Sequence, residues 1–152
     1  MTHPPLVLDA AGVHAYLARV WPEAAPVYAE SLLQLRPGFA RFWTQTDQRN
    51  LRPGGTVSGP TLMTAVDRGA YALVLGHLGG AALAVTSHLS IEFLRRPTAG
   101  ELIVDVELLK LGRTLISMAA RLYVDDPEAP PVATATVVYS RALVPDQAGG
   151  GG

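Results

Sequence analysis

Residues 58–78 read Ser-Gly-Pro-Thr-Leu-Met-Thr-Ala-Val-Asp-Arg-Gly-Ala-Tyr-Ala-Leu-Val-Leu-Gly-His-Leu. Ser58 and Gly59 are residue types that commonly cap a helix. Pro60 suits the first helical position because its φ is fixed and its missing N–H is not needed there. The stretch therefore predicts a helix that begins after Ser58 and continues to Leu78, and the rest of the fold is predicted around it.

The predicted central helix is apolar on almost every side. Asp67 and Arg68 are its only formally charged residues, and a step of about 100° per residue places Met63 and Tyr71 on the side of Asp67. A helix of this kind is normally enclosed by other structure, and a carboxylate on its apolar surface must be paired, protonated or used in chemistry. Asp67 is therefore the first candidate functional residue. As a purely structural group, it would be hydrogen-bonded to nearby backbone or to an arginine.

Composition limits the classes of function. The 152 residues are 49% hydrophobic and 16% charged, which predicts one globular domain with a buried core. The net charge of -1 gives no electrostatic reason to expect nucleic acid or an anionic membrane as a partner. The chain has no cysteine, which excludes disulfides and thiolate chemistry. Because no secretory signal is apparent at the N-terminus, we expect a cytoplasmic protein.

The residues before the central helix predict a helix and a hairpin. Apolar residues at helical spacing indicate a short helix from Asp9 to Trp21, which Asp9 caps and which Pro22 and Pro26 end. Two strand candidates and a polar loop follow, over 27–35, 39–46 and 47–57.

The residues after the central helix predict four strands. Gly79 ends the helix, and alternation in the first strand places Val85, Leu89 and Phe93 on one face and Thr86 on the other, as in a half-buried strand. Short turns between the later strands favour antiparallel pairing, so we expect an α+β fold whose sheet curls around the helix. The four strands are 83–94, 102–108, 116–124 and 132–141.

The chain divides into three predicted segments. We expect an N-terminal helical segment over 1–26, a main domain over 27–142 and a glycine-rich tail over 143–152 that is disordered.

Three short motifs surround the central helix. They are Leu51-Arg52-Pro53-Gly54-Gly55-Thr56-Val57-Ser58-Gly59-Pro60, then Phe93-Leu94-Arg95-Arg96-Pro97 followed by Gly100-Glu101, and Leu111-Gly112-Arg113. In this order, the motifs resemble those of hotdog-fold acyl-CoA thioesterases of the PaaI-like type, and the resemblance covers roughly 27–139. It implies a curved antiparallel sheet wrapped around one long helix, an acyl-CoA substrate and no cofactor or metal. It also implies a homodimer as the smallest active unit, and a tetramer of two dimers is expected.

The resemblance also implies roles for residues of the central helix. In that family a His-Gly-Gly motif opens the helix, and an acidic residue follows eight positions after the first Gly. Gly59 and Asp67 hold that spacing, whereas Ser58 replaces the His and Pro60 the second Gly. Ser58 is also a candidate for the catalytic centre, because its hydroxyl can still donate a hydrogen bond. Thioester hydrolysis needs a base or nucleophile beside the carbonyl carbon and donors aimed at its oxygen. Asp67 would fill the first role, and the Gly59 N–H would polarise the carbonyl.

Two further residues are candidates for the catalytic centre. Thr86 matches the position where related enzymes place a Ser or Thr that helps to hold the water, and Asn50 could supply a polar group from the loop before the helix. Each also has an ordinary explanation, because Thr packs well in strands and Asn is common in turns.

Five residues are candidates for substrate binding. Arg95, Arg96 and Arg113 could hold the phosphates of CoA, although exposed arginines are usually only solvated. Met63 and Tyr71 could shape the acyl pocket, although core packing would look the same.

Two classes of function remain open. The first is an acyl-CoA thioesterase, and the second is a non-catalytic hotdog protein that binds acyl-CoA or another apolar ligand. The second class remains open because Ser58 and Pro60 depart from the family motif. A hotdog dehydratase is a weaker third hypothesis, since no His is placed beside an acidic residue.

Overall fold

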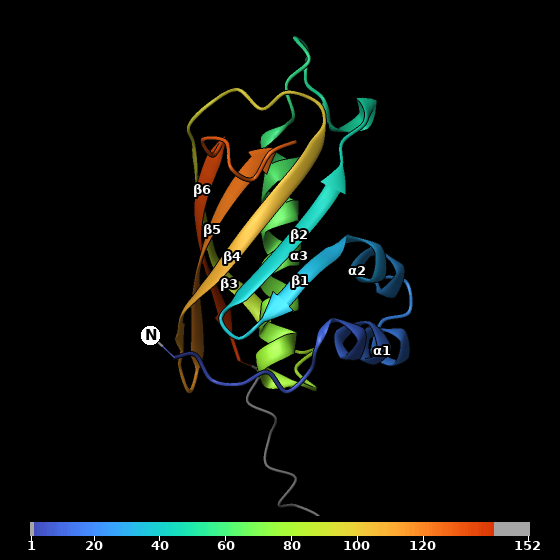
Figure 1. The fold of residues 1–152 in the computed structure, drawn as a ribbon, viewed down its shortest axis with the longest axis vertical. Helices are drawn as coiled ribbons and strands as arrows, with labels where there is room; N and C mark the ends of the chain where they lie inside the picture. The colour runs from blue at the N-terminus through green and yellow to red at the C-terminus, as the bar shows by residue number, and fades with distance from the viewer. Residues whose placement is uncertain (1, 142–152) are drawn as a thin grey trace, which may run out of the picture.

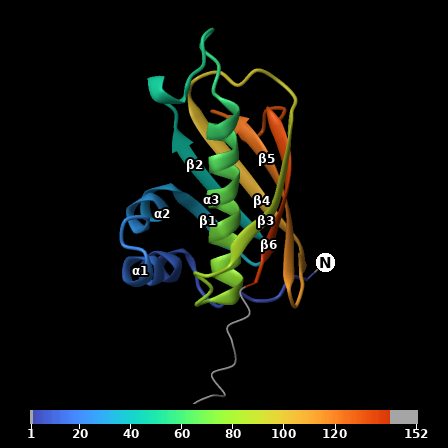
Figure 2. The same cartoon turned by 180° about the vertical axis from the view of Figure 1, so that it is seen from behind.

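The computed structural model describes residues 2–141, and its central element is the helix α3, Gly59–Leu78. An antiparallel sheet curves around one side of α3, and two short helices lie beside the same helix (Figures 1 and 2). The other helices are α1 Ala10–Val20, α2 Ala25–Ser31 and the 3-10 helix η1 Gln48–Asn50. The strands are β1 Leu32–Arg36, β2 Phe39–Gln45, β3 Val85–Phe93, β4 Glu101–Leu111, β5 Leu115–Val124 and β6 Ala133–Ser140.

The six described strands form one sheet in the order β1-β2-β4-β5-β6-β3. Every neighbouring pair is antiparallel, and β1 and β3 form the two edges. The prediction of an α+β hotdog fold, with a curved antiparallel sheet around one long helix, is confirmed.

The ends of α3 agree with the sequence signals. The Ser58 side chain caps the helix by accepting a hydrogen bond from the Thr61 N–H over 3.3 Å. Gly59 is the first helical residue, so Pro60 takes the second position rather than the first. The helix ends at Leu78, and it is followed by Gly79, whose φ of 75° favours glycine.

Small residues on α3 allow the sheet to lie close against it. A Cβ added at Gly69 would sit 3.1 Å from the Val106 Cγ2 atom, and one at Gly76 would sit 3.0 Å from the Leu35 Cδ2 atom. Both distances are shorter than ordinary van der Waals contacts, so a side chain at either position would require the neighbouring side chain of the sheet to move.

The N-terminal region contains one more helix than predicted. The first helix is confirmed, and Asp9 caps it by accepting from the Gly12 N–H over 2.8 Å. The strand expected over 27–35 is wrong, because residues 25–31 form α2 and only Leu32–Arg36 are extended. Pro26 lies in the first turn of α2, where its missing N–H is not needed, so it helps to begin a helix.

Strand β3 differs from the prediction in two ways. Thr86 pairs with Tyr139 and His88 with Val138, so Ser87 is an extra residue in a β-bulge. The bulge reverses the alternation and places Thr86 on the side of α3, together with Leu89, rather than on the opposite face. The strand is also mainly exposed instead of half-buried, because it forms an edge of the sheet in the single chain.

The remaining expectations concern the C-terminal tail, the division of the chain into segments and the membrane. The tail predicted over 143–152 lies outside the described residues, and the division of the chain at 26 and 142 stays a prediction. No helix within 2–141 has the length and hydrophobicity needed to cross a bilayer.

Candidate active site

The carboxylate of Asp67 contacts two hydroxyl groups from the sheet. Its Oδ1 atom accepts a hydrogen bond from the Thr86 Oγ1 atom over 2.6 Å and another from the Tyr139 hydroxyl over 2.7 Å. Thr86 and Tyr139 are paired residues of the neighbouring strands β3 and β6. The partners of Asp67 are therefore side-chain hydroxyls, and neither an arginine nor a backbone N–H donates to its carboxylate within residues 2–141.

Asp67 lies in a cavity of about 510 Å³, called here the Asp67 cavity. The Tyr71 ring stacks on Tyr139, with centroids 6.1 Å apart and an interplanar angle of 19°, and it meets Trp21 edge-on at 6.4 Å. The cavity thus combines the carboxylates of Asp67 and Glu23 with aromatic walls. Its side chains come from the N-terminal helical region, α3, β3 and β6, and they include Trp21, Tyr28, Asp67, Tyr71, Thr86 and Tyr139.

The tyrosines of the Asp67 cavity remain protonated at neutral pH. Burial raises the pKa of Tyr139, and the negative charge of Asp67 raises it further. Burial is also the main cause that raises the pKa of Tyr28 and Tyr71. The Tyr139 hydroxyl is therefore a hydrogen-bond donor to the carboxylate.

A second cavity of about 430 Å³, called here the Gly59 cavity, lies at the N-terminus of α3. Phe93 approaches Gly59 so closely that an added Cβ would be 3.3 Å from the Phe93 Cζ atom. The cavity is also lined by Arg52, Arg95 and Arg96, all exposed. Arginines beside a helix N-terminus suit an anionic group such as phosphate.

The structure brings only some of the predicted site residues together. Asp67, Thr86 and Tyr71 line the Asp67 cavity, and Gly59, Arg95 and Arg96 line the Gly59 cavity.

Four predicted residues line neither cavity. The hydroxyl of Ser58 is within 2.8 Å of the Thr61 hydroxyl. Asn50 accepts from the Asp47 N–H over 2.8 Å through its side-chain oxygen. Met63 is 39% exposed. Arg113 lies in the turn between β4 and β5, at the end of the molecule opposite the N-terminus of α3 (Figure 1).

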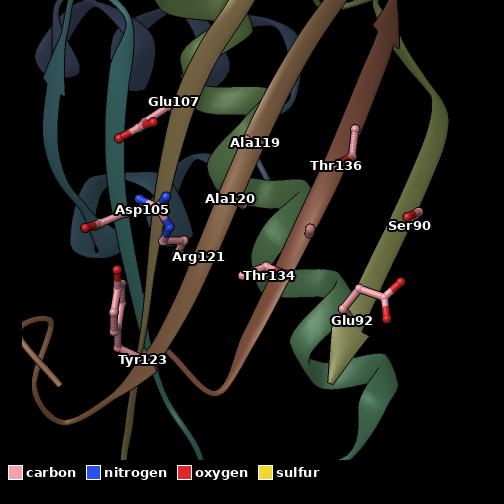
Figure 3. A pocket seen from close by; sticks show the side chains of 11 residues that line it. Ser90, Glu92, Asp105, Glu107, Ala119, Ala120, Arg121, Tyr123, Thr134 and Thr136 are labelled. Atoms are coloured by element: carbon pink, nitrogen blue, oxygen red, sulfur yellow. The ribbon is translucent and has the colours of Figure 1, made fainter. Parts of the chain in front are cut away.

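Another cavity lies on the outer face of the sheet. It has a volume of about 290 Å³, and Figure 3 views it with α3 behind the strands. Glu92, Glu107 and Arg121 line it, and so does Asp105, which forms a bidentate ion pair with Arg41 over 2.6 and 2.7 Å. No residue predicted for the site lies in this cavity.

Sequence reasoning missed Trp21, Tyr28 and Tyr139. The sequence predicts a strand at Tyr139, but nothing in the sequence indicates which side chain of the sheet faces Asp67. Trp21 and Tyr28 come from the helical region before the sheet, and their position depends on how α1 and α2 pack against α3.

The fold and the Asp67 carboxylate, hydrogen-bonded by two hydroxyls, define a hotdog protein with a candidate hydrolytic site. The model of the Thioesterase superfamily matches residues 54–130, slightly more than half of the 152 residues. The chain therefore belongs to the thioesterase superfamily, which confirms the resemblance that the motifs indicate.

Solved structures agree with this assignment. A candidate thioesterase from Silicibacter sp. TM1040 is 42% identical, with 89% of this chain and 92% of that chain covered and a TM-score of 0.75. The Escherichia coli PaaI protein of the phenylacetic acid degradation operon is 17% identical, with coverages of 88% and 96% and a TM-score of 0.71. A Streptococcus mutans protein bound to acetyl CoA is 20% identical, with coverages of 73% and 86% and a TM-score of 0.64. The last two comparisons show the fold alone, and no curated protein matches the chain significantly.

Proposed function

We propose that the protein is an acyl-CoA thioesterase, which hydrolyses a thioester to a free acid and CoA. The observation that carries this proposal is the half-buried Asp67 carboxylate, held by two hydroxyls in an aromatic-walled cavity of about 510 Å³. Membership of the thioesterase superfamily supports it.

Asp67 acts on the thioester in one of two ways. As a general base it takes a proton from water while the water oxygen attacks the carbonyl carbon. As a nucleophile it attacks that carbon itself and forms an anhydride, which water then hydrolyses. In both routes the carbon–sulfur bond breaks and the sulfur leaves as the CoA thiol. The Gly59 N–H, at a helix N-terminus, stabilises the oxygen that becomes negative.

The Gly59 cavity is proposed to hold the CoA end of the substrate. Arg95 and Arg96 lie on its rim and offer guanidinium groups to the phosphates. The acetyl CoA in the Streptococcus mutans protein of the same fold supports this class of ligand.

Two copies of the chain are proposed to form each active site, since Gly59 and Asp67 line different cavities. The edge strand β3 supports this arrangement, because Val85 is 60% and Phe93 56% exposed in the single chain. A tetramer of two dimers and a cytoplasmic location remain part of the proposal.

Replacement of Asp67 tests the assignment. Asp67→Asn keeps the shape of the side chain, but the amide can neither take the proton nor attack, so hydrolysis should fall by about 10² to 10⁴. Release of CoA thiol is measured with short, medium, long and aromatic acyl-CoAs. Asp126→Asn, in an exposed loop, is the matched control. Wild-type turnover by the Asp67→Asn protein would show that Asp67 is not catalytic.

One observation favours the non-catalytic alternative. The Ser58 hydroxyl is engaged with Thr61 as a helix cap, so it has a structural use in place of the substrate contact expected of the family His. If acyl-CoA binds in calorimetry but no member of the panel releases CoA thiol, the protein is a binding module.

A further inference from the structure

The two oxygens of the Asp67 carboxylate have different surroundings. Oδ1 receives the hydrogen bonds from both Thr86 and Tyr139, at 2.6 and 2.7 Å. No protein group in the part of the chain that the structure describes donates to Oδ2. A carboxylate oxygen with two donors is held in place and is less basic than its partner. The two oxygens are therefore chemically distinct.

Packing fixes the Tyr139 hydroxyl at this position. Tyr139 is only 2% exposed, and its ring stacks on Tyr71 at 6.1 Å. Its hydroxyl also lies 3.2 Å from the backbone oxygen of Asp67, so it is close to α3 as well as to the carboxylate. Because the bulge in β3 turns Thr86 to the same side of the sheet, the second donor reaches the same oxygen.

On the basis of the thioesterase function proposed above, we infer that Tyr139 is a positioning residue for Asp67. With Thr86 it holds Oδ1 and leaves Oδ2 as the reacting oxygen. As a base, Oδ2 takes the water proton while the water oxygen bonds to the carbonyl carbon, and that proton passes to the sulfur as the carbon–sulfur bond breaks. As a nucleophile, Oδ2 forms the bond to carbon, the sulfur takes a proton from water, and hydrolysis of the anhydride restores the carboxylate.

Other ionisable groups also face Asp67 and must be separated from it in any pH study. Arg68 and Tyr71 lie on α3, Glu23 lies before α2, and Tyr28 lies on α2. The tyrosines keep their protons on the acid side of neutrality because burial raises the pKa of each. A Glu23→Gln variant removes the other carboxylate, so the acid limb that remains belongs to Asp67.

The test compares Tyr139→Phe with variants that change the hydroxyl of Thr86 or of Tyr123. Tyr139→Phe keeps the ring, Thr86→Val removes the second donor, and Thr86→Ser retains a hydroxyl. Tyr123→Phe, on the outer face of β5, is the matched control.

Titration of Asp67 is followed by NMR with carbon-13-labelled aspartate, and the signal is assigned with Asp67→Asn. Loss of a donor to a charged group disfavours that charge. Tyr139→Phe and Thr86→Val should therefore move the titration, and the acid limb of kcat/KM, upward. The value of kcat should fall by about ten- to a hundredfold with little change in KM.

Failure of this inference can be told apart from failure of the proposed function. If the Asp67 titration is unchanged in both Tyr139→Phe and Thr86→Val, positioning is overturned whatever the activity. If the titration moves but the wild-type protein cleaves no acyl-CoA, the catalytic role of the hydrogen bond is overturned together with the proposed function. The inference is also overturned if the Asp67 titration moves upward in Tyr139→Phe but Tyr123→Phe loses as much kcat as Tyr139→Phe does. The loss of kcat would then be non-specific. Recovery in Thr86→Ser supports the inference, and it remains measurable if Tyr139→Phe does not fold.

Discussion

Gly59 and Asp67 lie on the same helix but line different cavities of the chain. Their separation of eight residues corresponds to about 12 Å along the axis, at 1.5 Å per residue. One thioester carbonyl must be about 3 Å from both groups, so a straight helix cannot supply both. Two antiparallel copies of α3 about a two-fold axis would bring Gly59 of one copy beside Asp67 of the other.

We therefore predict that a mixed dimer recovers activity. One protein carries Asp67→Asn, and the other carries Gly59→Leu, which blocks the Gly59 cavity. If sites are shared, each mixed dimer has one intact and one doubly damaged site. Random exchange of equal amounts should then restore about a quarter of the wild-type activity. Differentially tagged mixed dimers that form and remain inactive would place each site within one chain.

Replacement of the arginines of the Gly59 cavity should weaken binding of the nucleotide part of the substrate. Arg96→Ala with Arg95→Ala should raise KM for acyl-CoA more than for a truncated thioester without the nucleotide, because phosphate contacts are remote from the carbonyl. Arg96→Ala alone is the cleaner variant, since Arg95 also donates to the Pro131 carbonyl over 2.6 Å. Arg121→Ala, on the outer face of the sheet, is the control. Equal changes with both substrates would show that these arginines do not contact the nucleotide.

The buried His77 should make stability depend on pH. Its Nε2 accepts from the Gly38 N–H over 3.0 Å, which requires an unprotonated nitrogen, and burial lowers the pKa of His77. Below about pH 6.5 the unfolded chain binds a proton that the folded chain does not. The free energy of unfolding therefore decreases as the pH is lowered. The loss reaches at most about 1.4 kcal/mol per pH unit for this group.

Urea denaturation at pH 7.5 and pH 5.5 measures this effect. His77→Gln keeps an acceptor but does not titrate, so it should lose less stability than the wild-type protein between these values. His88→Gln, exposed on β3, should behave like the wild-type protein. The same loss in His77→Gln as in the wild-type protein would assign the pH dependence to other groups.

Gly69 should be intolerant of a larger side chain. A Cβ there would lie 3.1 Å from the Val106 Cγ2 atom and 3.4 Å from the Phe42 Cβ atom. A β-branched side chain at this contact should cost about 1 to 3 kcal/mol of stability through overpacking, which exceeds the gain in helix propensity of a few tenths. Thermal unfolding of Gly69→Val is compared with Met63→Val on the exposed face of α3. If Gly69→Val and Met63→Val have the same melting temperature, the sheet moves to accommodate the added side chain at position 69.

The central helix and its candidate functional residue could be predicted from the sequence alone. Ser58 and Gly79 mark the ends of α3 by local chemistry, namely a side-chain cap and a backbone with positive φ. Asp67 could be singled out because a charge on an apolar helix is costly wherever the helix packs. The antiparallel pairing of β4 with β5 and of β5 with β6 also followed from short connections, which are local features.

The tertiary structure decided which groups surround Asp67. Local alternation placed Thr86 on the wrong face, because the bulge at Ser87 arises from the pairing of β3 with β6. Residues 25–31 became a helix in which the buried Tyr28 packs near Phe42, with ring centroids 5.7 Å apart. Both outcomes depend on contacts between residues far apart in the chain, whose free energy exceeds the small local preferences for strand or helix.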